Sequence, residues 1–154
     1  MALFEVDFPD DFLSELTDVS FEMIAEEALT EAAPVLEESM KKSAAGVIEH
    51  GNPSDSEMVK SIKASKPKAT KTDAWIVNVG PRGYSNHTYH AQGRPSKRAY
   101  KVSNALKAIW KEYGIAHPGH FQPPRPFIER ATKDAADEVA KRLQEVYDRK
   151  TGAT

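Results

Sequence analysis

Two long segments near opposite ends of this 154-residue chain repeat apolar residues at the spacing of an α-helix. Over residues 18–49 the repeating residues are Phe21, Ile24, Ala28, Val35 and Met40. Over residues 127–149 they are Ile128, Ala131, Ala135, Val139, Leu143 and Val146. Each apolar stripe needs a surface to pack on, and the second is large enough to dock on a sheet. Because proline removes a helical hydrogen bond, we expect Pro34 to kink the first helix or divide it into two.

The segment Trp75–Val79 is the strongest strand signal in the chain. Its alternation places Trp75, Val77 and Val79 on one face. Upstream, Ser54 is followed three residues later by Glu57, which predicts a capping box that opens a short helix ending near Ile62.

Helical spacing returns between Tyr100 and Tyr113, where Gly114 provides a natural C-terminal stop. The residues that carry this spacing are Val102, Ala105, Leu106, Ile109, Trp110 and Tyr113. This pattern predicts a middle helix.

Residues 81–99 and 115–126 lack apolar periodicity and predict long loops, which in compact domains are usually functional or mobile. Apolar and acidic residues alternate briefly within residues 1–12, which predicts either an edge strand or an extended arm. We therefore expect an N-terminal arm followed by one α+β domain over residues 13–154. In this domain a small, mainly antiparallel sheet is packed by a long Pro-kinked N-terminal helix, a middle helix and a C-terminal helix.

The formal net charge of −2 conceals a strong asymmetry along the chain. Residues 1–58 contain 15 acidic and 2 basic residues, residues 59–111 contain 1 and 12, and residues 112–154 contain 7 of each. The basic residues of interest are Lys60, Lys63, Lys66, Lys68, Lys71, Arg82, Arg94, Lys97, Arg98 and Lys101. They predict either pairing with acidic surfaces, within one subunit or between subunits, or contact with nucleic acid. The sequence favours pairing between subunits over specific nucleic-acid binding, because no helix-turn-helix is evident and aromatic residues are sparse here.

Several classes of protein do not fit this composition. The chain has no Cys, so a disulfide framework and a thiol nucleophile are excluded. No apolar run approaches the roughly 20 residues of a membrane span, and the acidic N-terminus does not resemble a signal peptide. We therefore expect a soluble, intracellular protein.

Catalytic patterns are weak. His87 and His90, followed by His117 and His120, have the spacing of two metal-binding pairs. However, no Asp or Glu flanks either pair to hydrogen-bond the metal-binding imidazoles or to act as a general base. Neither a nucleophile elbow nor a phosphate-binding loop is present. We expect no catalytic residue, no cofactor and no metal, and keep a His-rich metal-dependent enzyme as the weakest alternative.

Four blocks in this order resemble the gene-ten-like family of tailed-phage proteins, which are tail-completion or head-to-tail joining components of siphophages and related prophages. The blocks are Ser56–Lys63, Ala74–Pro81, Asn104–Gly114 and Pro124–Ala131. The matching motif residues are Ser61, Ile62, Glu112, Tyr113, Gly114, Arg125, Pro126 and Phe127. The resemblance covers roughly residues 20–150 and implies that these residues have architectural or interface roles.

The resemblance also implies a function without catalysis. Its members form a ring, commonly sixfold, between the head connector and the tail tube. For this chain it implies a homo-oligomer in the neck of a virion, made in the host bacterial cytoplasm. The implied partners are connector or stopper proteins and tail-tube proteins, with non-specific contact to DNA in the channel and no membrane. A nucleic-acid-binding protein that uses the basic segment is the leading alternative.

Overall fold

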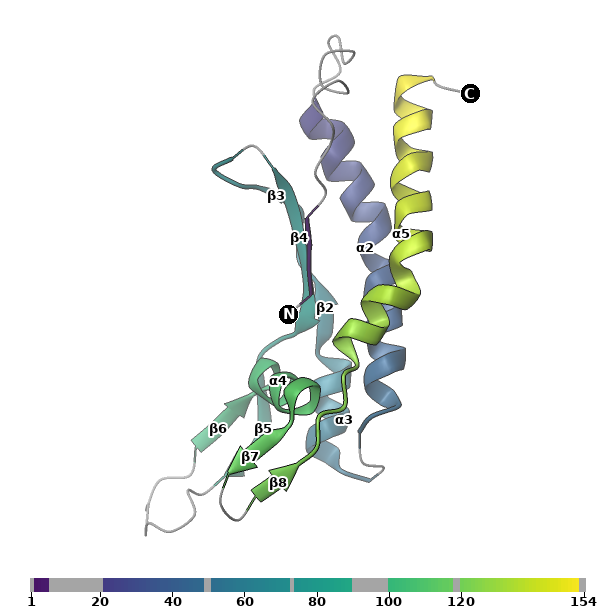
Figure 1. The fold of residues 1–154 in the computed structure, drawn as a ribbon. Coiled ribbons are helices and arrows are strands. Elements are labelled where there is room, and N and C mark those ends of the chain that lie inside the picture. Colours follow the sequence, from purple (N-terminus) through teal and green to yellow (C-terminus); the bar gives the residue numbers. More distant parts are fainter. Residues whose placement is uncertain are drawn as a thin grey trace.

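Helix α2 (Phe21–Ala45) lies between a small antiparallel sheet and helix α5 (Ile128–Thr151) in the computed structural model (Figure 1). The structure describes residues 2–5, 21–48, 51–72, 74–89, 100–117 and 120–152. The shorter helices are α3 (Pro53–Lys60) and α4 (Asn104–Tyr113). The strands are β1 (Ala2–Glu5), β2 (Ile62–Ala64), β3 (Lys68–Ala69), β4 (Trp75–Pro81), β5 (Tyr84–Tyr89), β6 (Tyr100–Ser103), β7 (Ile115–His117) and β8 (His120–Gln122). The predicted α+β class is confirmed.

Strand β4 is the centre of the main sheet, and every pairing in this sheet is antiparallel. Strand β1 pairs with one edge of β4, where Phe4 lies opposite Val77. Strands β2 and β3 pair with the other edge, where Ala64 lies opposite Val79. Residues Ala2–Glu5 thus form an edge strand, one of the two alternatives for residues 1–12, whereas residues 6–20 lie outside the described part of the chain.

The hydrophobic core forms where β4 and α5 pack against α2. Val77 and Val79 are 2% and 1% exposed, so alternate residues of β4 point into the core as the sequence predicts. The stripe of α5 is also confirmed, because Ala131, Ala135 and Val139 are buried. Burial of these apolar side chains is the main stabilising contribution to the fold.

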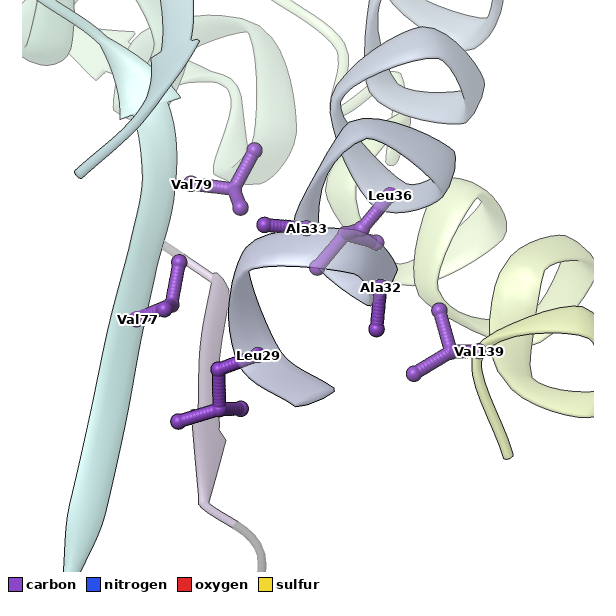
Figure 2. A pocket seen from close by; sticks show the side chains of 7 residues that line it. All are labelled: Leu29, Ala32, Ala33, Leu36, Val77, Val79 and Val139. Carbon is purple, nitrogen blue, oxygen red and sulfur yellow. The ribbon is translucent and has the colours of Figure 1, made fainter. Parts of the chain in front are cut away.

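A small cavity remains within this core (Figure 2). It has a volume of about 20 Å³ and is lined by Leu29, Ala32, Ala33, Leu36, Val77, Val79 and Val139. Figure 2 shows the side chains of α2 between the valines of β4 and Val139 of α5. Because every lining side chain is apolar and the volume is about that of one water molecule, the cavity is a packing defect and offers no polar group to a ligand.

A carboxylate connects α2 to the sheet. Glu37 accepts a hydrogen bond from the backbone N–H of Ala64 in β2 at 2.9 Å and from Lys41 at 2.5 Å. Partial burial favours a higher pKa for Glu37, but hydrogen bonds from Lys41 and Ala64 lower its pKa below the usual 4.5. The ionised carboxylate therefore fixes the position of β2 on α2.

The structure decides two local predictions about helices. Of the two alternatives for Pro34, division into two helices is excluded, because α2 continues through the exposed proline and its buried side continues from Ala32 to Leu36. Ser54 does not cap α3 either. Asn52 is the cap, because its Oδ1 accepts hydrogen bonds from the N–H groups of Ser54 and Asp55 at 3.0 and 3.4 Å.

The two predicted long loops are also partly wrong. Residues Tyr84–Tyr89 form β5, which pairs with β6, and residues Tyr100–Ser103 form that partner strand instead of the first turn of the middle helix. Residues Ile115–His117 and His120–Gln122 form the hairpin of β7 and β8. Backbone pairing stabilises these strands without an apolar alternation, so the periodicity of their side chains carries no signal.

Small side chains let α2 and α5 approach each other closely, which predicts a sharp difference between two neighbouring alanines. Ala135 is 2% exposed in the core, whereas Ala136 is exposed. We expect Ala135→Leu to lower the free energy of unfolding by about 2 kcal/mol because it overpacks the core. Ala136→Leu, the matched control, is expected to change it by less than about 0.5 kcal/mol. Urea unfolding measures both, and equal midpoints would contradict this packing.

Candidate interaction surface

Helix α4 turns its apolar residues toward solvent. Its apolar stripe has the spacing that ordinarily faces a core, yet Leu106, Ile109 and Tyr113 are 39%, 44% and 76% exposed. The buried residues of α4 are instead Asn104, Lys107, Ala108, Lys111 and Glu112. The helix is therefore amphipathic in the opposite sense to α5, and its apolar face is available to a partner.

Two exposed aromatic residues lie on strands beside α4. Tyr84 in β5 is 69% exposed and lies opposite Ser103, whose hydroxyl caps the start of α4. Phe121 in β8 is 81% exposed and belongs to the hairpin that follows α4 (Figure 1). We call Leu106, Ile109, Tyr113, Tyr84 and Phe121, together with the half-buried Trp110, the α4 surface. Large exposed apolar residues on neighbouring elements typically mark a site of interaction with another molecule.

Buried charges hold α4 in this orientation. Lys111 forms an ion pair with Asp55 of α3 at 2.9 Å, and the two side chains are only 10% and 8% exposed. One turn earlier, Lys107 donates hydrogen bonds to the hydroxyl of Ser54 and to its carbonyl oxygen, the latter at 3.3 Å. Rotating α4 to bury its apolar stripe would break these contacts and leave buried charges without partners, which is strongly unfavourable.

Strand β5 is connected to the same region by Glu57 of α3. The Glu57 carboxylate accepts hydrogen bonds from the Ser85 hydroxyl at 3.0 Å and from the Asn86 backbone N–H at 3.1 Å. At the start of α4, the Asn104 side chain donates to the carbonyl oxygen of Arg82 at 2.9 Å. Helices α3 and α4 and strand β5 thus form one unit with polar contacts at its centre, and Leu106, Ile109 and Tyr113 of α4 lie on its outside.

Glu112 joins the two motif blocks nearest the C-terminus. Its carboxylate accepts hydrogen bonds from the backbone N–H groups of Phe127 and Ile128, both at 2.8 Å, and from that of Glu129 at 3.1 Å. These donors are at the start of α5, where N–H groups have no partner within the helix. Glu112 therefore caps α5 from another helix, and Phe127, which is fully buried, anchors that start in the core.

Gly114 and Arg125 complete this junction. Gly114 has φ +77°, and a Cβ atom there would lie 2.5 Å from the carbonyl oxygen of Gln122, so only glycine fits. The backbone N–H of Arg125 donates to the carbonyl oxygen of Lys111 at 2.7 Å, and its guanidinium donates to that of Val47 at 3.2 Å. The structure thus brings Glu112, Gly114, Arg125 and Phe127 together as an architectural unit.

The other four motif residues take no part in the contacts of this unit. The Ser61 hydroxyl donates to the carbonyl oxygen of Met58 at the end of α3, and Ile62 is fully buried opposite Pro81 of β4. Tyr113 and Pro126 are exposed. Tyr113 alone among the motif residues belongs to the α4 surface.

The described basic residues of the predicted set are on the surface. Lys60 ends α3, Lys63 and Lys68 lie on β2 and β3, and Lys66 lies between these strands; all four are exposed. Within the part of the chain that the structure describes, none of them has an ion-pair partner within 4 Å. Arg94, Lys97 and Arg98 lie outside the described residues.

Two acidic residues of α2 pair with α5 instead. Glu27 forms ion pairs with Arg149 at 2.8 Å and Lys150 at 2.6 Å, and Arg149 also pairs with Glu31. Hydrogen bonds from Lys150 and then Arg149 lower the pKa of Glu27. Among the described residues, the acidic helix thus does not neutralise the basic segment through direct ion pairs, although Glu37 lies near Lys63.

Neither the described histidines nor the groove between α2 and α5 forms a recognisable metal site. No three His, Asp or Glu side chains among the described residues are grouped as metal ligands. His87 is on β5 and His117 pairs with His120 across β7 and β8, whereas His90 lies outside the described part. An open groove of about 590 Å³ between α2 and α5 has acidic and basic side chains on its walls.

None of the described helices is long and apolar enough to cross a bilayer.

Comparison of the chain with protein-family models, with curated proteins and with solved structures gave no match.

The cap formed by Glu112 predicts a large effect of a single substitution. We expect Glu112→Ala to lower the free energy of unfolding by about 2 kcal/mol, because three N–H donors at the start of α5 lose their acceptor. The control is Glu145→Ala, which removes an exposed glutamate of α5. It is expected to change the free energy of unfolding by less than about 0.5 kcal/mol. Urea unfolding followed by circular dichroism measures both. Equal stability of the two variants would contradict the capping role.

Proposed function

We propose that this chain is a structural protein of a tailed-phage virion, a tail-completion component that forms a ring between the head connector and the tail tube. The motif order that resembles the gene-ten-like family supports this function, and the α+β fold agrees with the one expected for the chain. The proposed partners are further copies of the chain, connector or stopper proteins and tail-tube proteins. The proposed location is the neck of the virion.

The single observation that carries this proposal is the outward-facing apolar side of α4. A protein that functions alone gains nothing from exposing Ile109 and Tyr113 while burying Lys107 and Lys111 on the same helix. A protein that is assembled into a larger particle has such a surface covered by its neighbours. The architectural use of Glu112, Gly114, Arg125 and Phe127 agrees with motif residues that shape an interface without lining a catalytic site.

The exposed lysines add a second contact surface to the proposal. Lys63 and Lys66 on and after β2 have no ion-pair partner among the described residues, so they are available to acidic neighbours or to DNA in the channel. The two possibilities predict different defects in the particle.

We expect the double variant Lys63→Glu, Lys66→Glu to block assembly if the lysines pair with neighbouring subunits. If they line the DNA channel, particles are expected to assemble but to leak DNA. The control is Lys133→Glu, Lys141→Glu, which reverses two exposed lysines on α5 that already pair with glutamates of their own helix. Electron microscopy of particles and nuclease protection of packaged DNA distinguish the results. Normal, sealed particles from the Lys63, Lys66 variant would contradict both roles.

The function itself is tested by co-assembly. Purified chain is mixed with tail tubes and with connectors, and virions are analysed by mass spectrometry. We expect the chain to bind at the end of tubes and to be present in virions. If it neither co-assembles nor occurs in virions, the proposal is wrong.

Binding to nucleic acid is a second candidate function, favoured by the exposed lysines without ion pairs. It predicts a gel shift of duplex DNA in low salt that weakens steeply as salt rises, because binding to phosphates releases counterions. The Lys63→Glu, Lys66→Glu variant is expected to reduce the dependence on salt. If wild-type protein does not shift DNA even in low salt, this candidate is eliminated.

A further inference from the structure

We propose that a second copy of this chain covers the α4 surface, and that the acidic beginning of α2 in that copy makes the contact. This inference rests on the proposed function, because it names the contact between subunits of the ring. These two parts of the chain are complementary in charge and in position.

The surroundings of the α4 surface are basic. Arg82 adjoins the start of α4 through the hydrogen bond from Asn104, and its own N–H donates to the carbonyl oxygen of Ser61, which follows Lys60. Lys101 lies on β6, directly before the helix. Lys60, Arg82 and Lys101 are all exposed, and none has an ion-pair partner among the described residues.

Acidic residues are nearly absent from this part of the chain. Residues 59–126 contain only Asp73 and Glu112 as acids, and Glu112 is buried with its carboxylate occupied by the start of α5. Asp55 and Glu57 of the adjoining α3 are already engaged by α4 and β5. A partner that covers the α4 surface must therefore supply its own negative charge together with apolar side chains. A strongly basic partner is disfavoured by repulsion.

The chain carries a surface of that chemistry at its acidic end. Glu22 and Glu26, near the beginning of α2, are exposed and have no ion-pair partner among the described residues. They belong to the 58-residue segment that contains 15 acidic and 2 basic residues. Glu22 and Glu26 thus place negative charge on the surface of the described residues, which is complementary to the exposed Lys60, Arg82 and Lys101.

The two surfaces lie at opposite ends of the molecule. Helix α2 has 25 residues and a length of about 37 Å, with α3 following its far end. Figure 1 shows the beginning of α2 at one end of the protein and α4 with β5–β8 at the other. Glu22 and Glu26 of one copy therefore cannot cover α4 of that copy, but they can cover α4 of the next. Repeating such a head-to-tail contact produces a closed ring when its rotation closes.

The test measures self-association of the purified full chain by sedimentation velocity over a series of protein and salt concentrations. We expect the wild type to form larger species as protein concentration rises and to dissociate as salt rises. Ile109→Glu is expected to raise the dissociation constant by about 30-fold, as for removal of a residue central to an interface. Ala140→Glu on the exposed side of α5 is the control and should associate like the wild type.

Charge exchange identifies the occupant and does not depend on the apolar variant folding. Arg82→Glu, Lys101→Glu and, separately, Glu22→Lys, Glu26→Lys are each expected to weaken association. The chain that carries all four substitutions is expected to recover it, because the same charges meet with their signs exchanged. Circular dichroism establishes that each variant is folded.

Three results would overturn the proposal: a wild type that remains monomeric throughout, an Ile109→Glu variant that is folded and associates normally, or failure of the fourfold variant to recover. Failure of this contact is distinguishable from failure of the proposed function. A chain that is present in virions but whose association ignores these substitutions keeps its function and loses this interface. A chain that self-associates as expected but is absent from virions keeps the interface and loses the function.

Discussion

The buried ion pair between Lys111 and Asp55 decides which side of α4 meets water, and the candidate site depends on that choice. At 2.9 Å and almost without exposure, the pair is strongly unfavourable to break by removing one partner. Lys107 repeats the same contact with α3 one turn earlier, through Ser54. Apolar residues have no comparable directional requirement, so the polar side of α4 is placed first and the apolar stripe takes the remaining side, which faces solvent. A surface suited to assembly thus follows from a small polar interior.

The next residue along the chain transmits this placement to the rest of the fold. Glu112 follows Lys111, and its carboxylate receives the first N–H groups of α5. The helix that carries the α4 surface therefore also sets where α5 begins, and α5 packs along α2 over the core of Val77 and Val79. The turn at Gly114 must stay tight for this arrangement, since a Cβ atom would collide with Gln122. Displacement of α4 by a partner would consequently also move the acceptor of the first N–H groups of α5, which couples the proposed interface to the rest of the protein.

The parts of the fold that were predictable are those whose side chains have a repeating relation to one core. The stripe of α5 and the alternation of β4 belong to this class, and so does the long N-terminal helix, for which a kink at Pro34 and a division there were both open. Strands β5 to β8 could not be found, because their ladders depend on backbone groups and their side chains do not alternate. For α4 the period locates a helix but cannot say which side is buried. That depends on Asp55, a partner 56 residues away with no local signal. The capping role of Glu112 could not be predicted for the same reason, although the motif resemblance includes this residue.

The net charge of −2 is the average of an acidic and a basic part of the chain. Arg149 and Lys150 neutralise Glu27 and Glu31 across the two long helices, so that part of the acidic excess is satisfied inside the protomer. Glu22 and Glu26 at one end, and Lys60, Arg82 and Lys101 at the other, are exposed without ion pairs among the described residues. A molecule with opposite charges at its two ends has a preferred orientation toward a copy of itself, because ends of like charge repel each other and ends of opposite charge attract each other. In the proposed ring, electrostatics would orient successive subunits and burial of the apolar side of α4 would stabilise the contact, the division of roles that head-to-tail assembly requires.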